Sequence, residues 1–371
     1  MFQNNLQDSS RGRGAANKST MYRSRSQLTQ LIFSLCFTLL LVQNPLLAQE
    51  NKESFFSRLY QQEIKAIDVE LELDLKVFLK NKKGEEYQEG KISFVNPTTQ
   101  EQELWNVELR PRGNMRRRIS YIPPIKLKLS KKNLKAQGLE KFNKIKLVAQ
   151  YRGGGMAEQY VIKEFHAYKM YNLVSPYSFK VQLIRLTLRD ISAKKRVIQY
   201  YGFLIEPEDE MAARLGGVPV EREKVRTSFF AKKEYHRMSL FQYMIGNTDW
   251  SVGNSHNIKL LKVPELDRLV PIPYDFDYAG LVNAVYATPF HTLPIKRVTD
   301  RLYRGNTFTK EDMEEIIPLF ESRAGDLIQL LETCEYLDQR NKKHTVEYMR
   351  SFFKECKRRK SFAYVLQKYG Y

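Results

Sequence analysis

The hydrophobic residues of this chain change their spacing once, and that change constrains the fold more than any other feature. From Val69 to Val77, apolar residues occupy every odd position and charged residues occupy the even positions between them. A period of two is typical of a β-strand with one buried face. We predict further strands at 105–109, 125–129, 145–147, 179–188 and 197–205.

The period becomes helical after the three glycines at 153–155. Residues 158–173 place Val161, Phe165 and Tyr168 on one face of a predicted helix. A helix-forming segment thus interrupts the predicted strands before the last two of them.

The chain downstream of His236 is predicted to be mainly helical. Thr309, followed by Asp312, has the pattern of a capping box that opens a helix. We predict helices at 240–245, 309–332 and 345–357 and a hairpin formed by 257–261 and 269–272. This order indicates an α+β chain, with about 65–205 as a β-rich lobe and 206–371 as a helical lobe.

The composition limits the class of protein. The 371 residues are 42% hydrophobic, which favours a folded core over a mainly disordered chain. Three cysteines are too few for a disulfide-rich scaffold, and Cys334 and Cys356 either form one disulfide or stay as buried thiols. A formal net charge of +19 favours anionic partners, but the basic residues are mostly dispersed. No sharp nucleic-acid motif occurs, so we expect no specific nucleic-acid partner.

The first fifty residues have the three parts of a secretory signal. Arg23 and Arg25 precede an apolar run, Leu31–Val42, and Ala48 stands before a polar segment. The run is shorter than the roughly 20 residues needed to span a bilayer. We therefore expect an export signal rather than a membrane span.

Cleavage after Ala48 would separate a leader, residues 1–48, from a mature domain of residues 49–371, and we expect translation to start at Met21. The mature chain then has no integral membrane span and is periplasmic, extracellular or at the cell surface. The alternative is that the leader stays attached as an N-terminal anchor.

Two basic segments have the residue types that bind phosphate. In Arg112-Gly113-Asn114 the glycine allows close backbone approach, and the arginine, with Arg116, can clamp phosphate oxygens. Lys146 in a predicted strand and Glu164 in the following helix can form an ion pair that presents the ammonium to a polyphosphate. A basic β-hairpin, and an ordinary exposed Lys and Glu, are the alternative interpretations.

Acidic and amide side chains flank the predicted hairpin. Asp249 is followed by Asn254 and Asn257 before the first strand, and Asp275-Phe276-Asp277 follows the second strand. Phosphoryl transfer needs an Asp to orient or deprotonate the attacking group, and an Asn and an Asp to hold Mg²⁺ on the phosphates. The alternative is a turn-rich hairpin whose polar side chains cap local backbone. A metal-hydrolase or Ser–His–Asp site is disfavoured, because neither a His-x-x-x-His pair nor a Gly-x-Ser-x-Gly segment occurs.

In this order the segments resemble the CotH family of spore-coat-type atypical protein kinases. The matching pieces cover about residues 65–285. They are Arg112-Gly113-Asn114 with the Pro-x-Lys-Leu-x-Leu strand at 124–129, the strand 146–149, the helix that contains Glu164, the strand 202–206, the loop 249–257 and Asp275-Phe276-Asp277. The resemblance implies an atypical protein-kinase-like bilobal fold, with ATP between a β-rich N-terminal lobe and a mainly helical C-terminal lobe.

The resemblance also implies which residues contact the phosphates of ATP. Lys146 would take the role of the phosphate-contacting lysine, and Glu164 would be its partner on the helix. The chain departs from the kinase pattern because no Gly-x-Gly-x-x-Gly segment covers the phosphates. Arg112 and Asn114 would then contribute to binding the nucleotide in place of that segment.

The remaining implied roles concern the metal and the proton. Asp249 would be the catalytic carboxylate, and Asp275 would hold Mg²⁺ or Mn²⁺. Asn254 has the spacing from Asp249 of the protein-kinase catalytic loop. Asn257, which directly precedes an apolar strand, is the metal ligand that we prefer.

We therefore expect a CotH-like kinase that transfers phosphoryl from Mg-ATP to a protein or glycan hydroxyl. ATP is scarce outside the cytoplasm, which motivates an alternative: a catalytically inactive kinase-like module that binds an anionic surface polymer or partner. A second alternative is a nucleotidyl transferase on the same fold. The mass added to an acceptor would distinguish this activity from phosphorylation.

Overall fold

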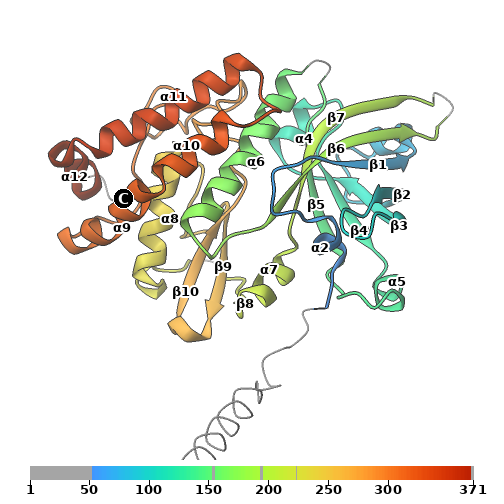
Figure 1. Cartoon of the computed structure of the whole chain (residues 1–371), viewed down its shortest axis with the longest axis horizontal. Coiled ribbons are helices and arrows are strands. Elements are labelled where there is room, and N and C mark those ends of the chain that lie inside the picture. Colours follow the sequence, from blue (N-terminus) through green and yellow to red (C-terminus); the bar gives the residue numbers. More distant parts are fainter. Residues whose placement is uncertain (1–51, 153–154, 193–194, 223, 369–371) are drawn as a thin grey trace, which may run out of the picture. The chain divides into compact units, whose positions relative to one another are not determined.

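The computed structural model describes residues 52–152, 155–192, 195–222 and 224–368. These residues belong to one compact unit. The predicted signal peptide, with its cleavage after Ala48 and its start at Met21, lies outside the described residues. Helices and strands are mixed within that unit, as the sequence predicts (Figure 1). None of the helices in the described ranges is long and apolar enough to pass through a bilayer.

Seven strands form a closed barrel in the order β1-β2-β3-β4-β5-β7-β6. They are β1 (Ile67–Leu73), β2 (Gln88–Val95), β3 (Gln102–Pro111), β4 (Ile125–Leu129), β5 (Lys144–Ala149), β6 (Val181–Asp190) and β7 (Val197–Ile205). Strands β1 and β6 pair in parallel and close the barrel, and the other neighbours are antiparallel. The sequence predicts six of these strands but not β2, in which only Ile92 and Phe94 are buried, and it does not predict the closure, because β1 and β6 are far apart along the chain.

The alternating pattern fills the barrel with apolar side chains. In β1, Val69, Leu71 and Leu73 are buried, and the residues between them are more exposed. The last four residues of β7 are all buried, because helix α6 (Met156–Val174) also packs against this strand. Strands covered on both sides have longer apolar runs, and the pattern of β7 follows that rule.

The strand predicted from Val69 to Val77 is too long. Strand β1 ends at Leu73, and the next residues form the helix α3 (Leu75–Lys80). The Asp74 carboxylate accepts a hydrogen bond from the Val77 amide at 2.9 Å and caps this helix. A helix cap therefore ended the strand where the period of two would have continued.

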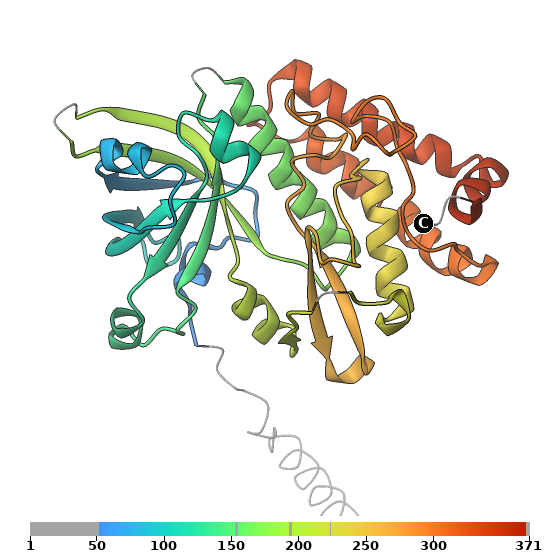
Figure 2. The same ribbon diagram turned by 180° about the vertical axis from the view of Figure 1, so that it is seen from behind.

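Helix α6 matches the predicted helix at 158–173 and lies between the barrel and the helical part of the chain (Figures 1 and 2). It contacts β5, β6 and β7 on one side and α10 (Ala324–Glu332) on the other. It is covered along most of its length, and even Lys163, Glu164 and His166 are buried. This helix therefore carries polar groups into the interior.

The helical part contains six α-helices among the described residues. They are α7 (Glu208–Arg214), α8 (Lys232–Met244), α9 (Lys310–Ser322), α10, α11 (Gln339–Cys356) and α12 (Arg359–Lys368). The predicted helix at 309–332 is two helices, separated at Arg323. The capping box of Thr309 and Asp312 is confirmed. Cys334 and Cys356 are buried free thiols.

A small sheet of order β10-β9-β8 packs beside these helices. Its strands are β8 (Val218–Pro219), β9 (Ile258–Val263) and β10 (Arg268–Pro273), and β9 and β10 confirm the predicted hairpin. The shorter helices are α2 (Phe55–Leu59), α4 (Met115–Ile119) and α5 (Lys131–Ala136). A second hydrophobic core joins α6, α8, the hairpin and the C-terminal helices, apart from the core inside the barrel.

Candidate functional site

The register of the β9–β10 hairpin places Asn257 and Asp275 at the same end. Ile258 at the start of β9 pairs with Pro273 at the end of β10, so the flanking residues leave the sheet together. The Tyr274 amide donates a hydrogen bond to the Asn257 carbonyl at 3.1 Å. The two segments that flank the predicted hairpin thus meet at its open end.

Asn257 and Asp275 both have a left-handed backbone, with φ of 54° and 61°. This conformation is uncommon for residues other than glycine, and Asn and Asp tolerate it best. The Asp275 amide donates a hydrogen bond to the Tyr168 hydroxyl of α6 at 2.8 Å, which holds the backbone in place. Strained residues of this kind often occur at functional sites.

Asp249 lies in the loop between α8 and β9 and has two side-chain partners. Its Oδ1 is 2.9 Å from the His256 Nε2, and its Oδ2 accepts a hydrogen bond from the Asn257 Nδ2 at 2.9 Å. The hydrogen bond with Asp249 raises the pKa of His256, and the negative charge of Asp275 acts in the same direction.

The structure also separates the two candidate asparagines. Asn254 accepts a hydrogen bond from the His256 amide at 3.2 Å through its own Oδ1 and so caps its own loop. Asn257 instead contacts both the carbonyl and the carboxylate of Asp249. Only Asn257 therefore lies at the open end of the hairpin with Asp249 and Asp275.

Arg116, on α4, is the centre of a buried cluster of ion pairs. Its Nη1 is 2.7 Å from Glu164 Oε2, and its Nη2 is 2.8 Å from Asp275 Oδ1. Its Nε is 3.2 Å from Asp277 Oδ2. The side chains of Arg116 and Glu164 are only 6% and 1% exposed, so this cluster is part of the interior.

This cluster corrects the predicted partner of Glu164. The ion pair of Glu164 is with Arg116 and not with Lys146. Gly113, with φ of 86°, lets the chain turn from β3 into α4, and α4 carries Arg116 to the helix α6. Arg116 is therefore held by carboxylates and is not free to clamp phosphate oxygens.

Burial and charge shift the pKa values of the cluster in opposite directions. Burial raises the pKa of Glu164 to about 8 against the effect of Arg116, and Asp277 and Asp275 add to the rise. Burial also raises the pKa of Asp277 to about 6. Burial lowers the pKa of the Arg116 guanidinium, but the neighbouring carboxylates raise it by more, so the net shift is upward. One guanidinium faces three carboxylates, so the cluster either retains protons or attracts a further cation.

Lys146 approaches the same region from strand β5. Its Nζ lies 4.7 Å from the centre of the ring of Tyr274, the residue that precedes Asp275. The pKa of Lys146 is lowered to about 8, first by burial and then by the charges of Arg112 and Lys259. The negative charge of Asp275 raises it, so Lys146 and Asp275 are electrostatic neighbours.

Arg112 and Asn114 differ in their relation to the site. Arg112 is half-buried, and its charge lowers the pKa of Lys146. Asn114 is exposed at the start of α4, and its side chain does not cap that helix. The structure therefore places Arg112 near Lys146 and leaves Asn114 exposed at the start of α4.

Two tyrosines of the site were not predicted from the sequence. The Tyr168 hydroxyl accepts a hydrogen bond from the Asp275 amide, and the Tyr286 hydroxyl donates one to Asp277 Oδ2 at 3.1 Å. Tyr168 follows Glu164 by four residues on α6, a spacing that puts both on one helix face. That spacing is the signal that could have identified Tyr168, whereas nothing local marks Tyr286.

Oxygen atoms at the hairpin end suit a hard divalent cation. Asp275 Oδ2 and Asn257 Oδ1 have no protein partner in the described ranges. Across the same ranges, no group of three or more His, Cys, Asp or Glu side chains is arranged to hold a metal ion. Mg²⁺ in phosphate-transfer sites is usually held by one or two carboxylates together with substrate phosphates. The donor set of Asp275 and Asn257 fits that kind of site.

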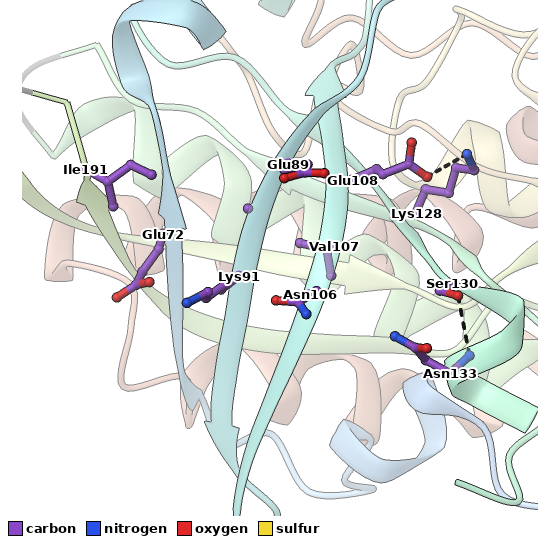
Figure 3. Close-up of a pocket in the computed structure, with 11 residues that line it drawn as sticks. Glu72, Glu89, Lys91, Asn106, Val107, Glu108, Lys128, Ser130, Asn133 and Ile191 are labelled. Carbon is purple, nitrogen blue, oxygen red and sulfur yellow. Dashed lines mark hydrogen bonds and ion pairs between the residues drawn. The ribbon is translucent and has the colours of Figure 1, made fainter. Parts of the chain in front are cut away.

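A separate pocket lies across β1, β2, β3 and β4 and reaches Ser130 and Asn133 at the start of α5 (Figure 3). Its volume is about 540 Å³. Glu108 and Lys128 form an ion pair of 2.6 Å within it. None of the predicted site residues lines this pocket, so it is distinct from the hairpin end.

No family model matches the chain, and no curated protein matches it. Among solved structures, the chain is similar to one described as the crystal structure of a Helicobacter pylori proinflammatory kinase, CtkA. The similarity covers 66% of this chain and 91% of that chain, with 8% sequence identity and a TM-score of 0.36. This similarity is distant.

Proposed function

We propose that this protein is a kinase-like phosphotransferase that moves a phosphoryl group from ATP to a protein or glycan hydroxyl. In this proposal the barrel and the helical part are the two lobes of an atypical protein-kinase-like fold. The observation that carries the proposal is the meeting of Asp249, Asn257 and Asp275 at one end of the hairpin. Lys146 supplies a positive charge from the barrel beside them.

Asp249 has the surroundings of a group that accepts a proton. His256 and Asn257 each hold one of its carboxylate oxygens. In the proposed reaction, Asp249 orients the acceptor hydroxyl and takes its proton as that oxygen bonds to the phosphoryl group. The bond from the phosphoryl group to the leaving ADP oxygen breaks in the same displacement.

Asp275 and Asn257 are the residues that we propose to hold Mg²⁺ or Mn²⁺. A bound divalent ion neutralises charge on the phosphates of the nucleotide. The left-handed backbone of both residues presents their side chains at the end of the sheet. Arg116 keeps one oxygen of Asp275 in place and leaves the other for a ligand.

Lys146 and Arg112 are the residues that we propose to face the phosphates. Burial makes the ammonium of Lys146 costly and lowers its pKa to about 8. A polyphosphate beside it would favour the charged form again. Glu164 is not its partner here, and its contribution is to position Arg116.

A second candidate function follows from the same cluster. Arg116 forms ion pairs with both Glu164 and Asp275. Glu164 therefore pairs with an arginine and not with the strand lysine that the sequence predicts. This departure favours a catalytically inactive, kinase-like module that binds an anionic polymer or partner. A nucleotidyl transferase would use the same residues and differ in the group transferred.

The test is ATP binding and turnover by the full chain with Mg²⁺ or Mn²⁺, beside Asp275→Ala. We expect metal-dependent ATP binding that Asp275→Ala abolishes, and a loss of at least ~10²-fold in rate, the scale of a removed catalytic group. Asp267→Ala is a matched control, because Asp267 also has a left-handed backbone, with φ of 45°, at the opposite end of the hairpin. It should bind and turn over ATP like the wild type.

Mass spectrometry of the acceptor would separate phosphorylation from nucleotidylation. Absence of ATP binding with either metal, in a chain that circular dichroism shows to be folded, would overturn the enzyme and favour the binding module. An equal loss in Asp267→Ala would mean that backbone strain, and not the carboxylate of Asp275, matters.

A further inference from the structure

A polar cavity of about 660 Å³ lies where the first turns of α6 meet the start of α11. Both views of the chain show these two helix starts side by side (Figures 1 and 2). The wall includes Gly280 and Leu281, just beyond the Asp275-Phe276-Asp277 motif. The residues proposed for ATP and metal do not line it, so this is a second site.

Lys163 is a buried cation in the wall of this cavity. It is 5% exposed, and within the described part of the chain its ammonium has no ion pair. Its Nζ lies 5.2 Å from the centre of the Tyr160 ring. Burial lowers the pKa of Lys163 to about 8, although Asp338 acts against this. A buried charge without a counterion is costly, and an anion in the cavity would offset that cost.

Two further basic side chains line the same cavity. Arg340 and His344 are exposed and lie four residues apart on α11, a spacing that puts them on one face of the helix. In the described ranges neither has an ion-pair partner. Together with Lys163, they give the cavity one buried and two exposed groups that can donate hydrogen bonds to an anion.

Two polar side chains of the wall, Asp338 and Gln159, are engaged by neighbouring groups. Asp338 is the one carboxylate in the wall, and its oxygens accept hydrogen bonds from the amide and the side chain of Asn341, at 2.7 and 2.8 Å. Gln159 accepts the Asp338 amide at 3.0 Å and donates to the Tyr336 carbonyl at 3.2 Å. Asp338 thus caps α11, and this engaged carboxylate leaves Lys163 and Arg340 without an ion-pair partner in the described part of the wall.

We propose that this cavity binds a compact anion of the phosphate class, with Lys163 as its buried charge partner and Arg340 and His344 at its mouth. The ligand is either free phosphate or the phosphate group of a monoester. This site does not depend on the proposed transfer of phosphoryl groups from ATP.

The cavity is joined to the acid cluster through two tyrosines. The rings of Tyr160 and Tyr286 pack edge to face with centres 6.3 Å apart. The Tyr286 hydroxyl donates to Asp277. An anion beside Lys163 and Tyr160 is therefore one aromatic contact away from the residues that hold Arg116.

The test measures binding of inorganic phosphate and of phosphoserine to the full chain by calorimetry, at constant ionic strength and with chloride as the reference. We expect Lys163→Met to lose at least ~10-fold in affinity, the factor that corresponds to about 1.4 kcal/mol. Removing an unpaired buried charge should not unfold the chain. Arg340→Gln, an exposed position, should weaken binding in the same direction and keeps the test valid if Lys163→Met does not fold.

Two variants serve as controls. Lys343→Gln removes the same charge from an exposed position of α11 that does not line the cavity, and should bind as the wild type does. Asp275→Ala should also retain phosphate binding, so failure of the ATP proposal and failure of this one are distinguishable. Wild-type affinity in both Lys163→Met and Arg340→Gln would overturn the proposal, as would an equal loss in Lys343→Gln. Tighter binding of phosphoserine than of inorganic phosphate would identify a monoester as the ligand.

Discussion

The surface of the barrel and the cluster around Arg116 both bring opposite charges together, but in different ways. On the barrel, Arg189 and Glu70 form an ion pair of 2.6 Å between two regular strands, and their side chains are 47% and 32% exposed. In the cluster, Arg116 and Glu164 are almost fully buried. Asp275, whose side chain contacts Arg116, has a left-handed backbone. Buried charge and strain, rather than the number of charges, mark the site.

The physical cost of the two arrangements differs as well. Two exposed charges that form an ion pair replace hydrating water with each other, so the pair adds little to the free energy of unfolding. A buried cluster loses the hydration of every member, and removal of one member leaves the others without a counterion. The comparison therefore predicts large effects at Arg116 and small effects at Arg189.

The largest effect on stability is expected from Arg116→Ala. It leaves Glu164 and Asp277 buried without their guanidinium, and we expect a loss of about 3–5 kcal/mol in the free energy of unfolding. The control is Arg117→Ala. Arg117 forms an ion pair of 3.2 Å with Glu85, whose side chain is 69% exposed. For this variant we expect the free energy of unfolding to change by no more than about 0.5 kcal/mol. Urea denaturation of the full chain measures both. Equal losses would mean that the cluster is no more important than the surface around it.

A smaller effect concerns the pH dependence of stability. Burial raises the pKa of Glu164 from 4.5 to about 8, so between these values the folded state binds a proton that the unfolded state releases. The contribution of Glu164 to the free energy of unfolding therefore falls as pH rises through this window and is constant above it. Asp277 acts in the same direction between 3.8 and about 6.

Glu164→Gln removes one of these titrating groups. We expect its free energy of unfolding to fall less steeply between pH 5 and 8 than that of the wild type, measured in about half-unit steps. Glu70→Gln, on the barrel surface, should keep the wild-type slope. A steeper decline in Glu164→Gln would contradict the raised pKa of this carboxyl group.

The difference between the two regions also explains what the sequence could predict. Six of the barrel strands and helix α6 follow from local periodicity, whereas β2 does not, and the hairpin that joins Asn257 to Asp275 follows from two adjacent apolar segments. The closure of the barrel does not, because it depends on pairing between distant strands. Asp74 changed a predicted strand into a helix start through a single cap.

The site shows the same limit at the level of single residues. Lys146 and Glu164 have the spacing of a strand lysine and a helix glutamate, but spacing along the chain does not decide which cation reaches Glu164. Arg116 is 48 residues from Glu164 and 159 from Asp275, and it reaches both through tertiary packing. A run of three arginines in the sequence resembles an exposed basic patch, and only the fold shows that Arg116 is buried.

The smallest effect is expected for the exposed ion pair of Glu70 and Arg189. A double-mutant cycle of Glu70→Gln and Arg189→Gln measures how strongly this pair couples, and we expect about 0.2–1 kcal/mol in urea unfolding. Because both side chains face solvent, 1 M salt should reduce that coupling. The corresponding cycle of Glu164→Gln and Arg116→Met should give a larger coupling that salt changes less, because the cluster excludes water and ions. Equal couplings with equal salt dependence would show that burial does not separate the two regions, and the raised pKa of Glu164 would then need another cause.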